Sequence, residues 1–147
     1  MSPNFAFRFL ISAVFACSLF AAGSANAYKV SSYAFVNEDG TLRINGKTIR
    51  LFGIYIPSTE RTCLTNRNPP LCGSRASVAL EFKIDGFVSC DLLKRNDDRT
   101  YIGLCRVNVS AFDEGDDLSA YLLQMGWAVA LPDSPFEYQA LEKIART

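Results

Sequence analysis

Hydrophobic and polar residues in the first part of the chain follow the patterns of short β-strands. Residues 30–36 form an apolar run, and "NEDG" at 37–40 is a turn signal. The next stretch, "TLRI", alternates, and "NGK" at 45–47 holds a two-residue hairpin turn before "TIRLFGIYI". Residues 30–56 therefore predict a three-stranded meander.

A second pair of strands is predicted at residues 87–93 and 101–109. Their sequences, "FVSCDLL" and "YIGLCRVNV", are joined by the polar turn "KRNDDR". In an antiparallel hairpin centred near residues 97–98, Cys90 falls opposite Cys105. Directly opposed residues lie about 4.5–5.5 Å apart, which suits a disulfide.

Two segments before and after this hairpin have helical patterns. Residues 74–83, "SRASVALEFK", carry alanine, leucine and lysine at helical spacing. The later "DDLSAYLLQMG" has a capping aspartate, Asp116 or Asp117, and a C-terminal stop at Gly126. We expect a helix in each segment.

The last helix is predicted from "SPFE". Ser134 is expected at the N-cap, Pro135 at the first helical position and Glu137 at the third, where it completes a capping box. This helix is expected to run to about Arg146.

The predicted order is three strands, a helix, two strands and two helices. Five short strands with early hairpins, and a helix before the last pair, are typical of a small closed barrel. The sequence thus predicts an α+β fold, a five-stranded OB-type Greek-key β-barrel with three helices, in one domain over residues 28–147.

The first 27 residues resemble a secretory signal peptide rather than part of the fold. One early basic residue, Arg8, precedes an apolar run over 9–22, and "ANA" stands before Tyr28 as a cleavage site. The alternative is an uncleaved anchor, but this apolar run of 14 residues is short against the roughly 20 of a membrane span. We therefore expect a periplasmic or secreted protein with no stable membrane anchor after cleavage.

Charge and composition limit the possible chemistry. Cleavage removes Arg8 and no acidic residue, which leaves 14 basic and 15 acidic residues. Strong sequence-independent binding of nucleic acid usually depends on a basic excess, although a local basic patch is compatible with this balance. The chain has no histidine, which excludes a histidine base, nucleophile or metal ligand.

Four cysteines remain after the predicted cleavage, and an even number in a small exported domain indicates disulfides. Four cysteines allow three pairings. We favour Cys63–Cys72, which closes a polar loop, together with Cys90–Cys105. A zinc site of four cysteines is the competing interpretation, but it usually needs pairs of cysteines closer in sequence.

The order and spacing of these segments resemble the staphylococcal nuclease family, over nearly all of the predicted mature chain. The stretches that carry the resemblance are "DGTLRINGKTIRLFGIYIP", "CGSRASVALEFKIDGFVSC", "RTYIGLC", "DLSAYLLQMGWAVA" and "FEYQALEKIAR". The resemblance implies calcium-assisted hydrolysis of a nucleic-acid phosphodiester. A carboxylate cluster would hold Ca²⁺, a glutamate would position water and two arginines would stabilise the phosphoryl charge.

This chain departs from that family pattern at most of the chemical positions. Arg50 matches the first arginine. Gly40 precedes Thr41 where the family has a metal-binding aspartate, Tyr55 stands at a second such aspartate, and Ser58 stands at the catalytic glutamate. Losing one charge-stabilising group typically costs about 10²–10³ in rate. We therefore expect a degraded catalytic site that needs no cofactor.

The family's second arginine is also displaced. When the pattern is anchored on Cys105, Thr100 stands at that position and Arg99 lies one residue away. Arg99 is therefore a candidate second catalytic arginine. The alternative is that it is a surface residue without a catalytic role.

The remaining candidates each have an alternative role. Arg50 is a candidate catalytic or anion-binding residue, or a strand arginine paired with Glu60 or Asp39. Tyr55 is a candidate ligand contact, or it fills the former metal pocket. Glu60 is a candidate displaced base, and Glu38 with Asp39 are candidate Ca²⁺ ligands in a divergent nuclease. The favoured hypothesis is a binding module for nucleic acid or another polyanion.

Overall fold

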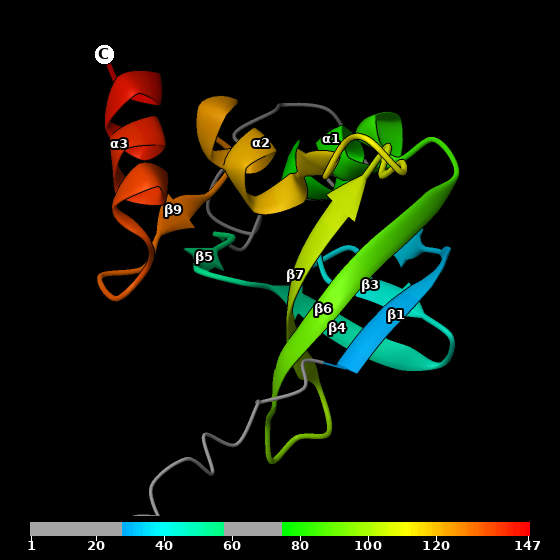
Figure 1. Ribbon diagram of the computed structural model, residues 1–147. Helices are drawn as coiled ribbons and strands as arrows, with labels where there is room; N and C mark the ends of the chain where they lie inside the picture. Colours follow the sequence, from blue (N-terminus) through cyan, green and yellow to red (C-terminus); the bar gives the residue numbers. More distant parts are fainter. Residues whose placement is uncertain (1–27, 58–74) are drawn as a thin grey trace, which may run out of the picture.

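The structure is a computed structural model and describes residues 28–57 and 75–147 (Figure 1). The predicted signal peptide, Glu60 and the predicted Cys63–Cys72 pair lie outside the described residues. Within the described part, the protein has an α+β architecture, in which three helices lie beside a curled mixed sheet (Figure 1). The α+β class and the three helices are therefore confirmed.

The main sheet has the strand order β1-β6-β7-β4-β3-β2, with β8 added beside β7. All neighbours are antiparallel except β4 and β7, which are parallel. The two ends of this order, β1 and β2, are separated in sequence only by Ala34, so the sheet curls back on itself. The main-sheet strands are β1 (Tyr28–Tyr33), β2 (Phe35–Val36), β3 (Leu42–Ile44), β4 (Lys47–Leu51), β6 (Phe87–Arg95), β7 (Tyr101–Val107) and β8 (Asp116–Asp117).

The first strand differs from the predicted meander. Only β2, β3 and β4 form consecutive antiparallel neighbours, whereas β1 pairs with β6 over its whole length. The three-stranded meander is therefore confirmed for β2, β3 and β4, but its first strand is only Phe35–Val36, because residues up to Tyr33 pair with β6. The nine-residue β6 would otherwise have an unpaired edge, and unpaired strand edges in a sheet are a liability.

The end of the predicted third strand also leaves the main sheet. After β4 the chain turns at Gly53, which has a positive φ of 72°. A side chain there would lie 2.9 Å from the ring of Tyr138, so glycine is required both by conformation and by space. Strand β5 (Ile54–Tyr55) then pairs with β9 (Val129–Ala130) in a separate two-stranded sheet.

The helices follow the predicted segments closely, as α1 (Arg75–Lys83), α2 (Leu118–Gln124) and α3 (Phe136–Ala145). The expected cap of α2 is confirmed at Asp117, whose carboxylate accepts hydrogen bonds from the backbone N–H groups of Ser119 and Ala120. The expected stop at Gly126 is confirmed too, since Gly126 has the positive φ of 72° that favours glycine there.

The capping box predicted for α3 is wrong. The N-cap is Pro135, and no side chain caps this end of the helix. The Ser134 hydroxyl is buried and has no hydrogen-bond partner among the described residues. The backbone oxygen of Ser134 instead accepts from the side chain of Gln139, so α3 begins one residue later than the pattern predicts.

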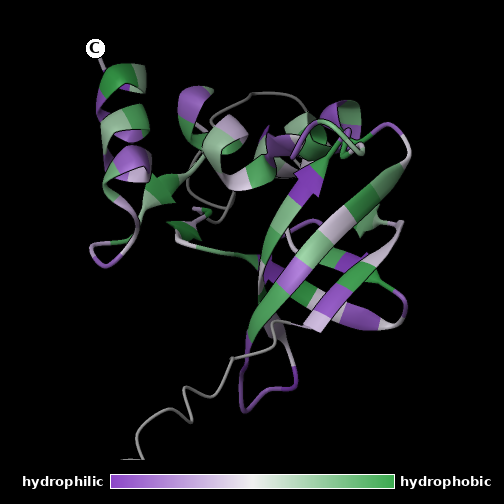
Figure 2. Cartoon of the chain, viewed as in Figure 1, coloured by the Kyte–Doolittle hydropathy of each residue, from purple (hydrophilic) through white to green (hydrophobic). Residues whose placement is uncertain are grey.

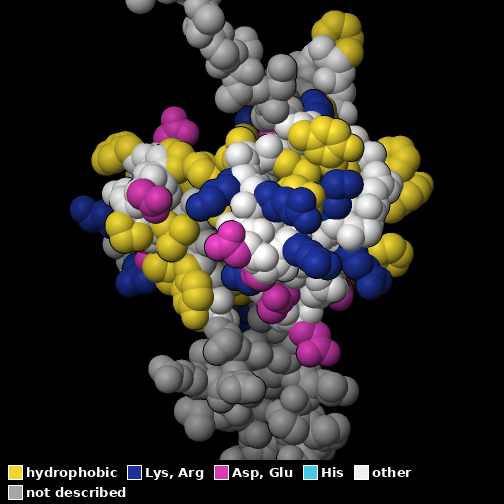
Figure 3. Space-filling model, turned by 90° about the horizontal axis from the view of Figure 1, so that it is seen from below, with side chains coloured by type: hydrophobic (Ala, Val, Ile, Leu, Met, Phe, Trp, Pro, Cys, Tyr) yellow, Lys and Arg dark blue, Asp and Glu magenta, His cyan; other side chains and the backbone are white. Residues whose placement is uncertain are grey.

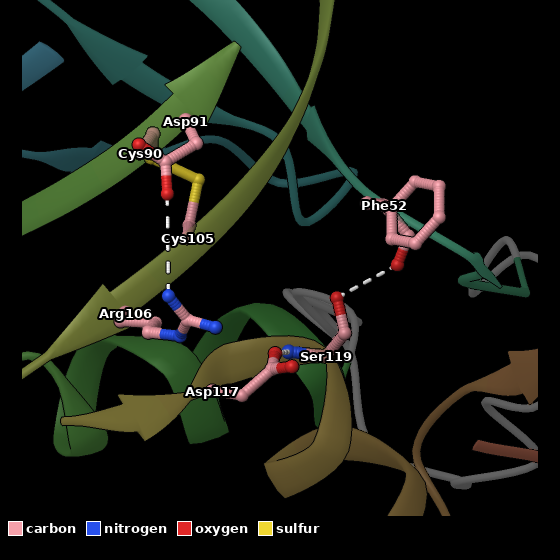
Figure 4. The surroundings of a disulfide bond; sticks show 7 residues. All are labelled: Phe52, Cys90, Asp91, Cys105, Arg106, Asp117 and Ser119. Carbon is pink, nitrogen blue, oxygen red and sulfur yellow. Dashed lines mark hydrogen bonds and ion pairs between the residues drawn. A yellow bond between two sulfur atoms is a disulfide. The ribbon is translucent and has the colours of Figure 1, made fainter. Parts of the chain in front are cut away.

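The core lies inside the curled sheet, where alternate residues of each strand are buried. Figure 2 shows this alternation of hydrophobic and hydrophilic residues along β6. Cys90 and Cys105 face each other across β6 and β7 and form the predicted disulfide, with a Cα–Cα distance of 4.0 Å (Figure 4). Residues fully buried in this core include Leu42, Ile44, Ile49, Leu80, Val88, Leu118, Leu122 and Leu123.

Candidate anion-binding site

Arg50 lies on the outer surface of β4, because the residues on either side of it, Ile49 and Leu51, point into the core. Its guanidinium donates to Asp98 Oδ2 at 3.2 Å, and 56% of the Arg50 side chain and 52% of that of Asp98 are exposed. Of the two partners predicted from the sequence, Glu60 lies outside the described residues. The structure pairs Arg50 with Asp98, in the turn between β6 and β7, and not with Asp39.

Two turns of the same geometry flank this region. In one, Asp39 Oδ1 accepts from the backbone N–H and the hydroxyl of Thr41, at 2.9 and 2.7 Å. In the other, Asp98 Oδ1 accepts from the same two groups of Thr100, at 3.0 and 2.6 Å. The two turn sequences, "NEDGT" and "NDDRT", also have Asn, Asp and Thr at the same positions. Asp98 thus accepts hydrogen bonds from its own turn with Oδ1 and from Arg50 with Oδ2.

The environment of Asp98 favours its charged form. The hydrogen bonds from Thr100 contribute most to lowering the pKa of the Asp98 carboxyl below its ordinary value, and the positive charge of Arg50 lowers it further. Asp98 is therefore ionised at neutral pH and available as a counter-ion for Arg50.

Arg99 does not join Arg50. It occupies the turn position that Gly40 occupies in the first turn, and both have positive φ, 65° for Arg99 and 79° for Gly40. Its exposed side chain lines neither of the two hollows beside Arg50 described below. The prediction that Arg99 acts as a second arginine finds no geometric support.

Two hollows meet at Arg50 and Tyr55, which line both. The smaller has a volume of about 180 Å³ and also contains Asp39 and Thr41. The larger, of about 490 Å³, extends from Arg50 past Phe52 and Leu131 to the buried Ser134. Its further lining residues include Leu93, Lys94, Asn96, Ile102 and Asp133.

Tyr55 is placed to contact a ligand. It lies on β5, directly beyond the Gly53 turn, and 56% of its surface is exposed. An exposed phenol ring stacks on a base or a sugar at little cost, whereas Ca²⁺ needs hard oxygen ligands. The residue type at this position therefore favours organic ligand contact over metal binding.

The acidic candidates are only partly brought together. Asp39 lines the smaller hollow with Arg50, but Glu38 is exposed and lines neither hollow. In the part of the chain that the structure describes, no group of three or more acidic, cysteine or histidine residues is arranged to hold a metal ion.

Basic side chains gather on the face that carries the turn between β6 and β7. Figure 3 shows Lys and Arg side chains in the middle of this face, with Asp and Glu among them. Lys94 and Arg95 are exposed at the end of β6, near the Arg50 hollow that Lys94 lines. The mixed charge agrees with the near-neutral composition.

Two residues of this site, Asp98 and Ser134, were missed by the sequence reasoning. The repeat of "NEDGT" in "NDDRT" signals a second aspartate turn and was available in the sequence. Nothing local predicts that Ser134 lines a hollow, because its position depends on the packing of α3 against the Gly53 turn.

Comparison with known proteins leaves the family resemblance as a hypothesis. The sequence matches none of the protein-family models, and no curated protein gives a significant match. Among the described residues, no helix is long and apolar enough to span a bilayer. The disulfide is of a kind that persists in oxidising compartments and is consistent with export.

Proposed function

We propose that the protein is an exported, nuclease-like binding module that binds nucleic acid or another polyanion through Arg50 and Tyr55. The observation that carries this proposal is that the guanidinium and the phenol ring line the same two hollows. Arginine offers a phosphate two parallel hydrogen bonds, and the ring beside it offers a stacking surface. The site lacks the carboxylates that the nuclease resemblance requires at Tyr55 and Ser58, so binding without cleavage is the favoured outcome.

The strand order supports an OB-type Greek-key barrel for this module. If β1 and β2 are taken as one bent strand, the order closes on itself through β3, β4, β7 and β6, and the single parallel contact joins β4 to β7. OB-type barrels commonly bind oligonucleotides on their surface. The fold and the Arg50 site therefore support the same class of ligand.

A fluorescence anisotropy titration with labelled single-stranded DNA, RNA and heparin tests the proposal. We expect salt-sensitive binding that Arg50→Ala weakens by several-fold, because neutralised phosphates release counter-ions. Arg146→Ala is the matched control, since it removes an exposed arginine just after α3 that pairs with Glu142. Equal binding by Arg50→Ala and wild type would refute the proposal.

A divergent metal-dependent phosphodiesterase is the second candidate. The observation that favours it is that Asp39 lines the smaller hollow with Arg50, so one carboxylate and one guanidinium are already together. Glu38 and Glu60 would have to complete a Ca²⁺ site. Cleavage of DNA or RNA that requires Ca²⁺ and disappears in both Asp39→Asn and Arg50→Ala would establish this function in place of the first.

A further inference from the structure

Three large aromatic side chains stand exposed on the outer surface of the curled sheet, apart from the Arg50 hollows. Tyr33 is 65% exposed, Phe35 64% and Phe87 60%. They come from three strands, β1, β2 and β6, and their neighbours in these strands are buried, as Val88 is, or half-buried. We call these three residues the aromatic platform.

The strand pairing brings two rings of the platform together. Tyr33 and Phe87 are direct partners across β1 and β6, with ring centroids 4.5 Å apart and planes inclined by 56°. Phe35 follows Tyr33 by two residues, and in an extended chain residues two apart point to the same side. Because the rings are tilted rather than stacked face to face, they do not cover each other's faces.

A positive charge lies beside Phe35 of the platform. Arg43 is the direct partner of Phe35 across β2 and β3, and its guanidinium carbon lies 5.4 Å from the centre of that ring. Arg43 forms no ion pair with any residue that the structure describes. The four strands β1–β4 contain only basic charged residues, namely Lys29, Arg43, Lys47 and Arg50.

We propose that the aromatic platform, with Arg43, binds single-stranded nucleic acid by stacking bases on Tyr33, Phe35 and Phe87. Exposed rings next to unpaired cations match a ligand that alternates flat bases with anionic phosphates. A purely apolar protein partner would not need the acid-free charge of these strands. A duplex would not fit either, because its bases are already stacked on each other.

The platform and the Arg50 site lie on one continuous surface. Arg43 pairs with Thr48 across β3 and β4, and Arg50 is the next outward residue on β4. A strand bound at the platform can therefore direct its phosphates past Arg43 towards Arg50. The inference narrows the ligand of the proposed function from any polyanion to single-stranded nucleic acid, and it places the bases on a second surface.

The test compares two labelled ligands of equal charge on the oxidised full-length protein or its exported form. One is an oligothymidylate of about 12 nucleotides, within the site sizes of OB-type domains. The other is an abasic sugar-phosphate strand of the same length. Tyr33→Leu/Phe35→Leu keeps the surface apolar but removes two ring faces, and Phe136→Leu removes an exposed ring on α3 as a control.

We expect each removed ring to lower the affinity of the double variant for oligothymidylate by about 5- to 100-fold. Its affinity for the abasic strand should change little. Phe136→Leu should change neither. Unchanged affinity for oligothymidylate in a folded double variant overturns the inference, as does an equal loss on both strands. Loss of binding in Arg50→Ala with an unaffected double variant would leave the proposed function standing while the platform fails. Loss of oligothymidylate binding in the double variant, with unchanged binding in Arg50→Ala, would support the platform and refute the proposed role of Arg50.

Discussion

At the scale of single residues, the Arg50–Asp98 ion pair bears on the anion binding proposed for this site. Asp98 accepts from Arg50 with the oxygen that does not hold the turn, so an incoming phosphate must compete with this carboxylate. Exposed ion pairs contribute little, typically about 0–1 kcal/mol. In the proposed function, Asp98 is therefore a weak internal competitor that lowers affinity without blocking the site.

Asp98→Asn is expected to strengthen binding of a polyanion by up to about fivefold. Asparagine keeps the oxygen that accepts from Thr100, so the turn is retained. Asp97→Asn changes the net charge equally at the neighbouring exposed position and is the control. Titration by fluorescence anisotropy measures both. An equal gain in the two variants would show that only overall charge matters.

Ser134 gives a second prediction at this scale, because its two interpretations predict opposite effects of a change to alanine on the free energy of unfolding. As a helix cap, its replacement by alanine would cost about 1 kcal/mol. As a buried hydroxyl with no partner among the described residues, its removal relieves an unpaired polar group. We expect Ser134→Ala to leave the free energy of unfolding unchanged or raise it by about 1 kcal/mol.

Urea unfolding followed by circular dichroism measures this difference. Asp117→Ala is the comparison, since it removes a true cap and should destabilise the protein by about 1–2 kcal/mol or more. If Ser134→Ala lowers the free energy of unfolding by a similar amount, Ser134 does cap α3.

At the scale of elements, the buried residue of α3 is Tyr138, which joins this helix to α2 and to the turn after β4. The hydroxyl of Tyr138 donates to Asp117, the cap of α2. The ring of Tyr138 covers Gly53, where the chain turns from β4 into β5. The same Asp117 carboxylate thus caps the N-terminus of α2 and accepts a hydrogen bond from α3.

Tyr138→Phe is expected to lower the free energy of unfolding by about 1.5–3 kcal/mol, the usual contribution of a hydrogen bond to a charged group. Burial first, and Asp117 second, raise the pKa of Tyr138 well above its ordinary value of 10.0. The unfolded tyrosine therefore loses its proton at a lower pH than the folded one. This part of the stability is complete below about pH 10 and is lost as the pH rises above it.

Unfolding of wild type and Tyr138→Phe at neutral and alkaline pH measures this effect. The difference between the two proteins should be largest at neutral pH and should shrink above the ordinary tyrosine pKa. A difference that grows with pH would contradict the assigned partner.

Elements defined by local sequence could be predicted, and those defined by distant contacts could not. The "NG" turn at Asn45 and Gly46 was found because both residues adopt the positive φ that the turn type needs. The pairing of β1 with β6 was missed, since the pattern of residues 30–36 shows which side chains are buried but not which strand lies beside them.

At the scale of the whole molecule, the same distinction applies to the candidate site. The outward position of Arg50 follows from alternation within β4. Its partner Asp98 lies 48 residues away in sequence and is brought close only by the parallel pairing of β4 with β7. The hollows depend on how β5, β9 and α3 pack beside the sheet, which no single segment encodes.

The Cys90–Cys105 disulfide joins β6 to β7 at the centre of the sheet, so it stabilises the element that carries Asp98. The bond links residues 15 apart in sequence, and a loop of that size is stabilised by about 3 kcal/mol in the chain-entropy account. Cys90→Ala/Cys105→Ala should therefore lower the free energy of unfolding by about 2–4 kcal/mol, measured by urea unfolding.

The same double variant tests the remaining predicted pairing. If Cys63 and Cys72 form the second disulfide of the exported protein, the denatured variant should contain no free thiol when titrated with a thiol-reactive dye. Two free thiols would show that these cysteines stay reduced, and the stability lost in the variant would then measure the only disulfide present. Mutation is preferable to chemical reduction here, because a reductant would open both bonds and would not separate the sheet from the loop.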